Sequence, residues 1–161
     1  MKKVLVISTS LRPRSNSEAL ADEFVRGAQE AGNEVEKVTL RGKDIRFCKG
    51  CLVCQKTQEC VIKDDDAPAI VRKMYEADAI CFATPIYYYE MSGQMKTLLD
   101  RANPLFDTDY AFTKAYLLAF TSCRRPQRTM SRHRHGLSPD LEAGLPALSM
   151  RILLVRYSPV E

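Results

Sequence analysis

The sequence has no long apolar segment. No stretch of its 161 residues approaches the roughly 20 consecutive apolar residues that a membrane-spanning helix needs. The apolar run near the start covers only residues 4–7, which is too short for a signal peptide. We therefore expect a cytoplasmic protein with no membrane association. Nearly half of the residues are apolar, so the chain is long enough to bury the core of one domain.

The chain also lacks the motifs of several common function classes. Neither G-x-G-x-x-G nor G-x-x-x-x-G-K-[ST] occurs, so a dinucleotide fold of the usual kind and a triphosphatase loop are not expected. The net charge of +4 is modest, and the arginines at residues 124–134 have no aromatic residues between them. We therefore expect no nucleic-acid binding. The two histidines, His133 and His135, receive no role, and no constellation of nucleophile and general base is visible.

What the sequence does contain is an alternation of strand and helix patterns. Apolar or alternating runs predict strands at residues 4–7, 35–40, 79–83, 115–120 and 152–155. Helices are expected at residues 17–31, after an aspartate cap at residues 64–66, and at residues 92–101. Residues 41–66 and 84–89 are expected to be loops. This order predicts an α/β fold with a doubly wound parallel sheet and right-handed crossovers, with residues 35–40 near a sheet edge.

The first loop, residues 8–17, joins the first strand to the first helix. Ligands of doubly wound sheets bind at the carboxyl ends of the strands, and a helix N-terminus there favours phosphate. The loop is rich in hydroxyl groups, and Arg12 and Arg14 add positive charge. Because it has no Lys-Ser pair for a metal-bound triphosphate, it predicts a site for a terminal monophosphate. The alternative is a plain helix-capping run in a polar loop.

The second loop, residues 84–89, leaves the third strand at the same end of the sheet. It ends in three consecutive tyrosines, Tyr87, Tyr88 and Tyr89, and Gly93 follows shortly after. Aromatic walls and a close backbone approach suit a flat ring, so the two loops together predict an aromatic cofactor with a phosphate tail. The alternative is that tyrosines are merely common at loop edges.

Four of the six cysteines form a cluster, Cys48, Cys51, Cys54 and Cys60. Thiolates at such short spacing can hold a [4Fe–4S] cluster, whereas structural zinc usually pairs two C-x₂-C units that lie further apart. The alternative is a set of reduced thiols in a loop that lines a dimer interface. Cys81 lies within a strand pattern and is expected in the core.

Residues 10–17 (SLRPRSNS) resemble the phosphate loop G-S-P-R-x-x-S/G-N-S/T of the NAD(P)H-dependent FMN reductase and iron–sulfur flavoprotein families, with Thr9 and Leu11 in place of the usual Gly and Pro. Residues 84–101 resemble the same families' S-P-I-Y segment with its Q-x-K-x-x-x-D-R continuation. The resemblance implies a flavodoxin-like fold with strand order 2-1-3-4-5. It implies FMN contacts from Ser10, Arg12, Ser15, Asn16, Ser17, Thr84, Pro85, Ile86, Tyr87, Tyr88 and Ser122, and it gives Cys48, Cys51, Cys54 and Cys60 as the ligands of a [4Fe–4S] cluster where one is present.

The function that the resemblance implies is an FMN-dependent oxidoreductase that uses NAD(P)H, in which the flavin performs the chemistry. The cysteine stretch resembles both relatives whose iron–sulfur cluster relays electrons to the flavin and relatives described only as FMN reductases, so the resemblance leaves the presence of the cluster open. Two alternatives remain open: a non-catalytic electron carrier of the flavodoxin type, and a structural remnant unable to hold flavin. The expected partners are further copies of the chain, as a homodimer or homotetramer, and a ferredoxin or another redox protein.

The composition changes after Ser122. Residues 123–161 contain seven arginines and no lysine, whereas residues 1–122 contain ten lysines and seven arginines. We therefore expect a flavodoxin-like domain at residues 1–122, with a cysteine-rich loop at residues 44–64, and an atypical tail. The hypothesis is a shifted reading frame or a truncation near residue 123. The alternative is a loosely built final element.

Overall fold

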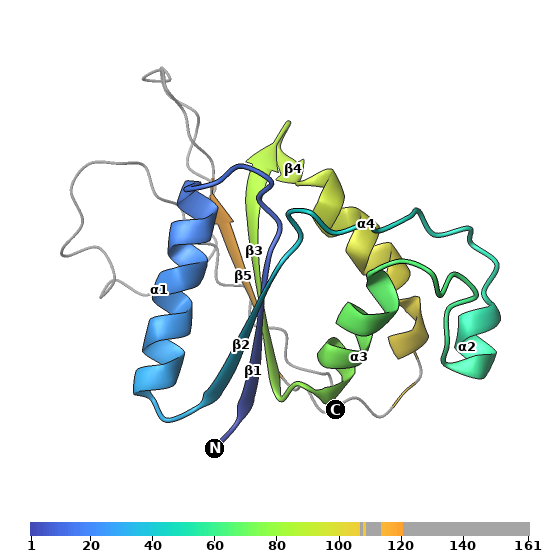
Figure 1. The fold of residues 1–161 in the computed structure, drawn as a ribbon, viewed down its shortest axis with the longest axis horizontal. Helices are drawn as coiled ribbons and strands as arrows, with labels where there is room; N and C mark the ends of the chain where they lie inside the picture. Colours follow the sequence, from blue (N-terminus) through green and yellow to red (C-terminus); the bar gives the residue numbers. More distant parts are fainter. Residues whose placement is uncertain (107, 109–113, 121–161) are drawn as a thin grey trace.

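The computed structural model describes residues 1–106, residue 108 and the backbone of residues 114–120. Ser122, the strand expected at residues 152–155 and the tail at residues 123–161 lie outside the described residues, so the reading-frame hypothesis stays a prediction. The described part is a layered α/β structure in which helices cover both faces of one sheet (Figure 1). In the described residues, no helix has the length and apolar content that crossing a bilayer requires.

The sheet is mostly parallel. Its strands are β1 (Lys3–Ser8), β2 (Glu34–Thr39), β3 (Ala79–Tyr87), β4 (Glu90–Met91) and β5 (Lys114–Phe120). The parallel order is β2-β1-β3-β5, and the short β4 pairs antiparallel with the end of β3. Since β5 is the fourth long strand, the order agrees with 2-1-3-4 of the flavodoxin-like arrangement. The predicted fold class is confirmed, and β2 lies at the sheet edge as its alternating pattern indicated.

Helices connect the parallel strands and pack on the two faces of the sheet. They are α1 (Asn16–Glu30), α2 (Val53–Thr57), α3 (Ala67–Glu76), α4 (Gly93–Arg101) and the 3₁₀ turn η1 (Asn103–Leu105). Helix α1 covers one face, whereas α3 and α4 cover the other (Figure 1). Helix α1 ends before Gly32, which has φ +78° and whose N–H donates to the Gln29 carbonyl, as the predicted stop requires.

The core has two apolar layers because successive residues of β1 face opposite sides of the sheet. Leu5 and Ile7 pack toward α3 and α4, whereas Val4 and Val6 pack toward α1. Cys81 lies fully buried in the second layer, and its burial raises the pKa of the thiol to about 12. The expectation that Cys81 is a core residue is confirmed.

Two loop predictions were wrong. Residues 84–89 are not a loop, because β3 continues to Tyr87 and turns directly into β4. The β-branched and aromatic residues of this segment favour an extended backbone, and a two-residue turn is enough to reverse it. Residues 41–66 contain the short helix α2, which lacks the length from which a helical period can be recognised.

Candidate functional site

The phosphate loop lies between the end of β1 and the start of α1. Ser15 is the N-cap of α1, and its Oγ accepts a hydrogen bond from the Glu18 N–H at 3.2 Å. A helix start leaves four backbone N–H groups without helical partners, and this cap uses one of them. The remaining N–H groups and the positive end of the helix dipole face the loop, which is the arrangement that binds a phosphate.

Buried hydroxyl groups line this loop. Ser10, Ser15 and Ser17 are all buried, and the Oγ atoms of Ser15 and Ser17 lie 3.2 Å apart. Ser10 Oγ donates to the Arg12 carbonyl at 3.3 Å, which bends the loop over itself. Each of these hydroxyls retains acceptor or donor capacity for a further partner, because a hydroxyl group can make up to three hydrogen bonds.

Ser8 is a residue that the predicted ligand set missed. It is the last residue of β1 and fully buried, and its Oγ has no hydrogen-bond partner in the described part of the chain. The alternation of β1 places Ser8 on the same face as Val4 and Val6, toward α1. A buried hydroxyl without a partner is unfavourable, so it marks a position where a ligand oxygen is expected. The signal in the sequence is a serine that ends an otherwise apolar strand.

The positive charges of the loop are exposed. Arg12, Arg14 and Asn16 all lie at the surface, and neither guanidinium forms an ion pair with a described residue. Arg14 has φ 53°, so the loop makes its sharp turn there without a glycine. Exposed guanidinium groups above a helix start suit the two negative charges of a phosphate monoester.

A buried network of hydroxyl groups connects the phosphate loop with the second predicted loop. Thr9 Oγ1 and Ser92 Oγ lie 2.9 Å apart, and Thr84 Oγ1 donates to Ser92 Oγ at 3.2 Å. Ser92 is also the N-cap of α4, accepting from Met95 N–H at 3.4 Å. All three hydroxyls are buried. The Thr84 side chain therefore points into the protein, so only the backbone of Thr84 remains for the predicted contact with a ring.

The tyrosines form a strained and exposed hairpin. Tyr87 pairs with Glu90, and the two turn residues, Tyr88 and Tyr89, have φ of 50° and 67°. Positive φ at both positions is the pattern of a type I′ turn, which normally selects Asn-Gly. Tyr88 is 96% exposed and Tyr89 is 81% exposed, and their rings meet edge to face with centroids 6.0 Å apart. Strain without burial is a mark of function rather than of packing.

The two loops lie together at one end of the sheet. Strands β1 and β3 are adjacent and parallel, with Ser8 opposite Ala83, so the segments that leave them emerge side by side (Figure 1). Pro85 and Ile86, both half-buried, lead from this edge to the tyrosines. Of the predicted cofactor residues, Ser122 lies outside the described residues. The structure brings the other predicted cofactor residues to the same end of the sheet, where β1 and β3 finish.

The four clustered cysteines lie on the segment between β2 and α3. Cys48 and Cys51 are exposed, Cys54 is buried and Cys60 is half-buried. Within residues 1–106, no three His, Cys, Asp or Glu side chains are grouped so as to hold a metal ion. The donor set fits an iron–sulfur cluster in chemistry and number, since four thiols stand on one short segment. The assignment of these residues as cluster ligands stays a proposal.

Two of these thiols accept hydrogen bonds from N–H groups. The Gly50 backbone N–H donates to Cys48 Sγ at 3.4 Å, and Asn103 Nδ2 donates to Cys54 Sγ at 3.5 Å. The Cys60 thiol is one of the groups that raise the pKa of a neighbouring arginine, described next. Such donors are the usual surroundings of metal-bound thiolates.

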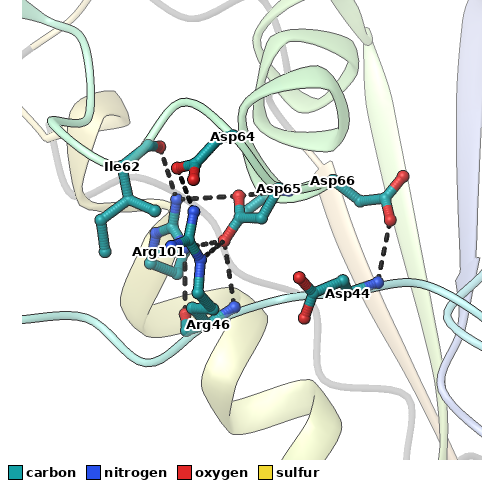
Figure 2. A network of polar contacts seen from close by, with 8 residues as sticks. Asp44, Arg46, Ile62, Asp64, Asp65, Asp66 and Arg101 are labelled. Atoms are coloured by element: carbon teal, nitrogen blue, oxygen red, sulfur yellow. Dashed lines mark hydrogen bonds and ion pairs between the residues drawn. The ribbon is translucent and has the colours of Figure 1, made fainter.

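That arginine, Arg101, is at the end of α4 and is 2% exposed. Figure 2 shows its guanidinium between Ile62, Asp65 and Arg46. It forms an ion pair with Asp65 and donates to the Ile62 carbonyl at 2.9 Å and the Arg46 carbonyl at 3.0 Å. Burial alone would lower the pKa of Arg101, but hydrogen bonds with Asp65 and Cys60 raise it. The side chain is therefore a buried, permanent positive charge.

Asp65 is the other half of this pair, and its side chain is fully buried. Burial alone would raise the pKa of its carboxyl group, but the hydrogen bonds from Arg101, Arg46 N–H and Ala67 N–H lower it below its usual value. Asp66 occupies the N-cap position of α3 but makes no side-chain capping bond, whereas Asp65 Oδ1 accepts from the N–H of Ala67, the first helical residue, at 3.1 Å. Asp65 combines this contact at the helix start with an ion pair that the sequence does not indicate.

We call residues 44–66 the cysteine segment, and we call the place where its two ends are hydrogen-bonded to each other its neck. The Asp66 N–H donates to the Asp44 carbonyl at 2.9 Å, and the Asp44 N–H donates to Asp66 Oδ2 at 2.8 Å. Lys43 Nζ adds an ion pair with Asp66 at 2.8 Å. Because its ends are joined, the conformation of the cysteine segment is restrained independently of the sheet.

A cavity of about 620 Å³ opens beside the cysteine segment. Its walls come from the segment itself, from α3 and from the end of α4, and they include Cys60, Arg101 and Tyr75. The cavity therefore gives Cys60 access to a volume that is separate from the phosphate loop.

Comparison with known proteins connects these features. The family model of the NADPH-dependent FMN reductases matches residues 2–152. The chain belongs to this family. An iron–sulfur flavoprotein of Methanocaldococcus jannaschii is 40% identical over 103 residues, which is 64% of this chain and 53% of that protein. The chain spans about half the length of the curated relatives it matches.

Solved structures agree with the fold of this FMN reductase family member. RosB, with 8-demethyl-8-formylriboflavin-5′-phosphate bound, superposes with a TM-score of 0.57 at 26% identity, covering 74% of this chain and 52% of RosB. An NAD(P)H:quinone oxidoreductase from Methanothermobacter marburgensis has a TM-score of 0.60 at 20% identity, covering 73% of this chain and 63% of that one. The second likeness supports the fold alone.

Proposed function

We propose that this protein binds FMN at the edge of the sheet where the phosphate loop meets the tyrosine hairpin, and that it is an FMN-dependent oxidoreductase reduced by NAD(P)H. The observation that carries the proposal is that Ser8, whose buried hydroxyl has no partner among the described residues, ends β1 beside β3, the strand that continues to the strained and exposed Tyr88 and Tyr89. An anion site and an aromatic wall at the same end of the sheet match the two ends of FMN. Family membership supports the same conclusion.

At the phosphate end, the residues that hold the anion are Ser8, Ser10, Ser17, Arg12 and the first N–H groups of α1. Hydroxyl and backbone N–H donors fix the position of the phosphate oxygens, and the guanidinium group adds charge. The backbone turn at Arg14 brings these donors to one side of the loop.

At the ring end, Pro85, Ile86 and the tyrosine hairpin form the wall on which the flavin ring packs. Flavin supplies the redox chemistry when bound, so the protein's part is to position the ring, exclude water from one of its faces and leave the other accessible to the nicotinamide.

The cysteine segment is proposed to hold a [4Fe–4S] cluster on Cys48, Cys51, Cys54 and Cys60. Support comes from the donor set, from the N–H groups that donate to two of the thiols, and from relatives described as iron–sulfur flavoproteins. The cluster would exchange single electrons with a partner such as a ferredoxin.

Assembly as a homodimer or homotetramer is proposed from the same segment. Phe47, Leu52 and Val61 expose large apolar side chains on it, at 81%, 55% and 50% respectively. Several exposed apolar side chains on one short segment are typical of an interaction surface. Sedimentation of the protein with and without iron tests the assembly: a monomer in both forms contradicts it.

The experiment that tests FMN binding is titration of the purified protein with FMN and with riboflavin, followed by fluorescence quenching. We expect FMN to bind at least about tenfold more tightly, because only FMN has the phosphate that the loop recognises. Equal affinity for both ligands contradicts the phosphate assignment. Turnover of NADH or NADPH by the FMN-loaded protein tests the enzyme. Reduction by dithionite or a ferredoxin without pyridine nucleotide turnover would indicate a flavodoxin-type carrier instead.

A variant sharpens this test. Ser8→Ala removes a hydroxyl that has no partner among the residues that the structure describes, so the variant without FMN is expected to be as stable as the wild type or slightly more stable. The same variant is expected to bind FMN about fivefold more weakly, since one hydrogen bond to the phosphate is lost. The matched control is Ser17→Ala, whose hydroxyl contacts Ser15 and whose loss is expected to lower stability and affinity together.

A further inference from the structure

Helix α4 contacts both candidate redox sites. At its N-terminus, Ser92 bonds to Thr9 of the phosphate loop and to Thr84 before the tyrosine hairpin. At its C-terminal end, Arg101 and the following Asn103 reach the cysteine segment. The helix has nine residues, or roughly 13 Å at about 1.5 Å per residue. One short helix therefore sets the position of the cysteine segment relative to the flavin loops.

Arg101 joins the two ends of the cysteine segment to α4. It contacts the Arg46 carbonyl before the first cysteine, and the Ile62 carbonyl and the Asp65 carboxylate after the last one. These bonds use its two terminal nitrogens. Its Nε is buried and has no hydrogen-bond partner in the described residues. Arg101 and Cys60 both line the 620 Å³ cavity, and Cys60 is close enough to contribute to the raised pKa of the guanidinium.

Asn103 contacts the segment at its buried cysteine. Its Nδ2 donates to Cys54 Sγ at 3.5 Å, while its Oδ1 accepts from Gln55 Nε2 at 3.5 Å. In this orientation both ends of the Asn103 amide have a partner, the nitrogen at Cys54 and the oxygen at Gln55. Asn103, the first residue of the 3₁₀ turn η1, thus presents an N–H group to a thiol that solvent hardly reaches.

We propose that Asn103 and Arg101 are positioning residues for the cysteine centre: Asn103, in the turn after α4, holds Cys54 through an N–H donor, and Arg101 joins both ends of the cysteine segment to α4. An N–H donor beside a cluster thiolate and a buried positive charge beside the segment both stabilise the more negative, reduced state, so the two residues raise the reduction potential of the centre. The effect on the potential rests on the proposed cluster. The contact of Asn103 with Cys54 does not, and the two parts can be tested separately.

The first test uses the metal-free protein. Asn103→Leu keeps a similar side-chain volume but removes the donor, and we expect Cys54 to be alkylated by iodoacetamide about fivefold faster, the factor that one lost hydrogen bond is worth. Cys48 is exposed and accepts from the Gly50 N–H rather than from Asn103, so it serves as the internal standard. Gln29→Leu, which removes an exposed amide from α1, is the control and is expected to change neither rate. An unchanged Cys54 rate in Asn103→Leu overturns the proposal.

The second test uses protein reconstituted with iron and sulfide under anaerobic conditions. We expect Asn103→Leu to have a more negative midpoint potential and to lose iron to a chelator about tenfold faster, whereas Gln29→Leu matches the wild type. Arg101→Lys retains the positive charge but not the hydrogen bonds to both ends of the cysteine segment, so its midpoint potential is expected to lie closer to that of the wild type than the midpoint potential of Arg101→Met. Wild-type potentials in both Asn103→Leu and Arg101→Met at full iron content overturn the proposal. A wild type that takes up no iron refutes the proposed cluster, and the alkylation rates then decide the positioning role alone.

Discussion

The tyrosine hairpin should be less stable than a hairpin of ordinary composition, and this can be measured. Tyr88 and Tyr89 occupy turn positions with φ of 50° and 67°, which Asn and Gly adopt at much lower cost. The double substitution Tyr88→Asn, Tyr89→Gly is therefore expected to stabilise the flavin-free protein, although it removes two large aromatic side chains.

The magnitude follows from three contributions. Relief of the left-handed backbone is worth about 1 kcal/mol or somewhat more at each position, so about 2 to 3 kcal/mol in all. The edge-to-face contact between the two rings, with centroids 6.0 Å apart, is lost at about 1 kcal/mol. The greater freedom of Gly in the unfolded chain costs a further ~0.5 to 1 kcal/mol. Since both rings are more than four-fifths exposed, little burial is lost, and the net gain is about 1 kcal/mol.

Thermal unfolding followed by circular dichroism measures this gain. A net 1 kcal/mol corresponds to a rise in Tm of about 3 °C for a chain of this length. With saturating FMN the wild type is expected to have the higher Tm, because the double variant loses its contacts with the flavin ring and binds FMN at least about fivefold more weakly. The matched control is Tyr75→Asn, which makes the same change at a half-exposed helical position and is expected to lower the Tm without affecting FMN.

The result that refutes this reasoning is a flavin-free double variant that melts below the wild type. The tyrosines would then stabilise the hairpin, and their left-handed backbone would not be strain maintained for ligand binding. An increase in Tm together with unchanged FMN affinity would keep the strain but remove its functional explanation.

Three further outcomes are expected. Ser92→Ala removes the cap of α4 and one partner of two buried threonine hydroxyls, so urea unfolding should show a free energy of unfolding about 2 to 3 kcal/mol lower than that of the wild type. Thr97→Ala on the same helix is the control and should change this free energy by no more than about 0.5 kcal/mol, so equal losses in both variants would contradict the hydroxyl network. In native protein at pH 8, iodoacetamide should label Cys48 and spare Cys81, because a pKa of about 12 leaves only about one thiolate in ten thousand; peptide mass spectrometry decides, and a labelled Cys81 would show that the strand opens. Because the pKa of Asp65 is lower in the folded protein, its stabilising contribution is complete above the unfolded value of about 3.9 and is lost as the pH falls through the folded value. Asp65→Asn should therefore flatten the dependence of stability on pH below about pH 4, and an unchanged slope would contradict the assignment.

The order of strands and helices could be predicted from the sequence because each element has a clear period. Buried parallel strands appear as apolar runs such as residues 4–7, and α1 shows the helical spacing of its apolar face. The phosphate loop could be predicted for a related reason: a hydroxyl-rich segment between a strand and a helix has only a few physical uses. These features depend on neighbours in sequence.

The features that could not be predicted depend on residues that are distant in sequence. The Asp-Arg pair at the end of α4 gives no indication that Arg101 is buried against Asp65, which lies 36 residues earlier. The extension of β3 into a hairpin was missed because a tyrosine run normally avoids positive φ, so its turn carries no Gly or Asn signal. The orphan hydroxyl of Ser8 becomes visible only when the packing of α1 against β1 is known.

The closed neck between Asp44 and Asp66 has a consequence for how such proteins diversify. A segment whose two ends are already bonded to each other can be lengthened, shortened or exchanged without altering the spacing between β2 and α3. The strands whose ends carry the phosphate loop and the hairpin pair directly with one another, so their register does not depend on the cysteine segment. A protein of this design could gain or lose a second redox centre through a single insertion or deletion. A graft of residues 45–65 into a relative with the same neck would transfer the cysteines as a unit.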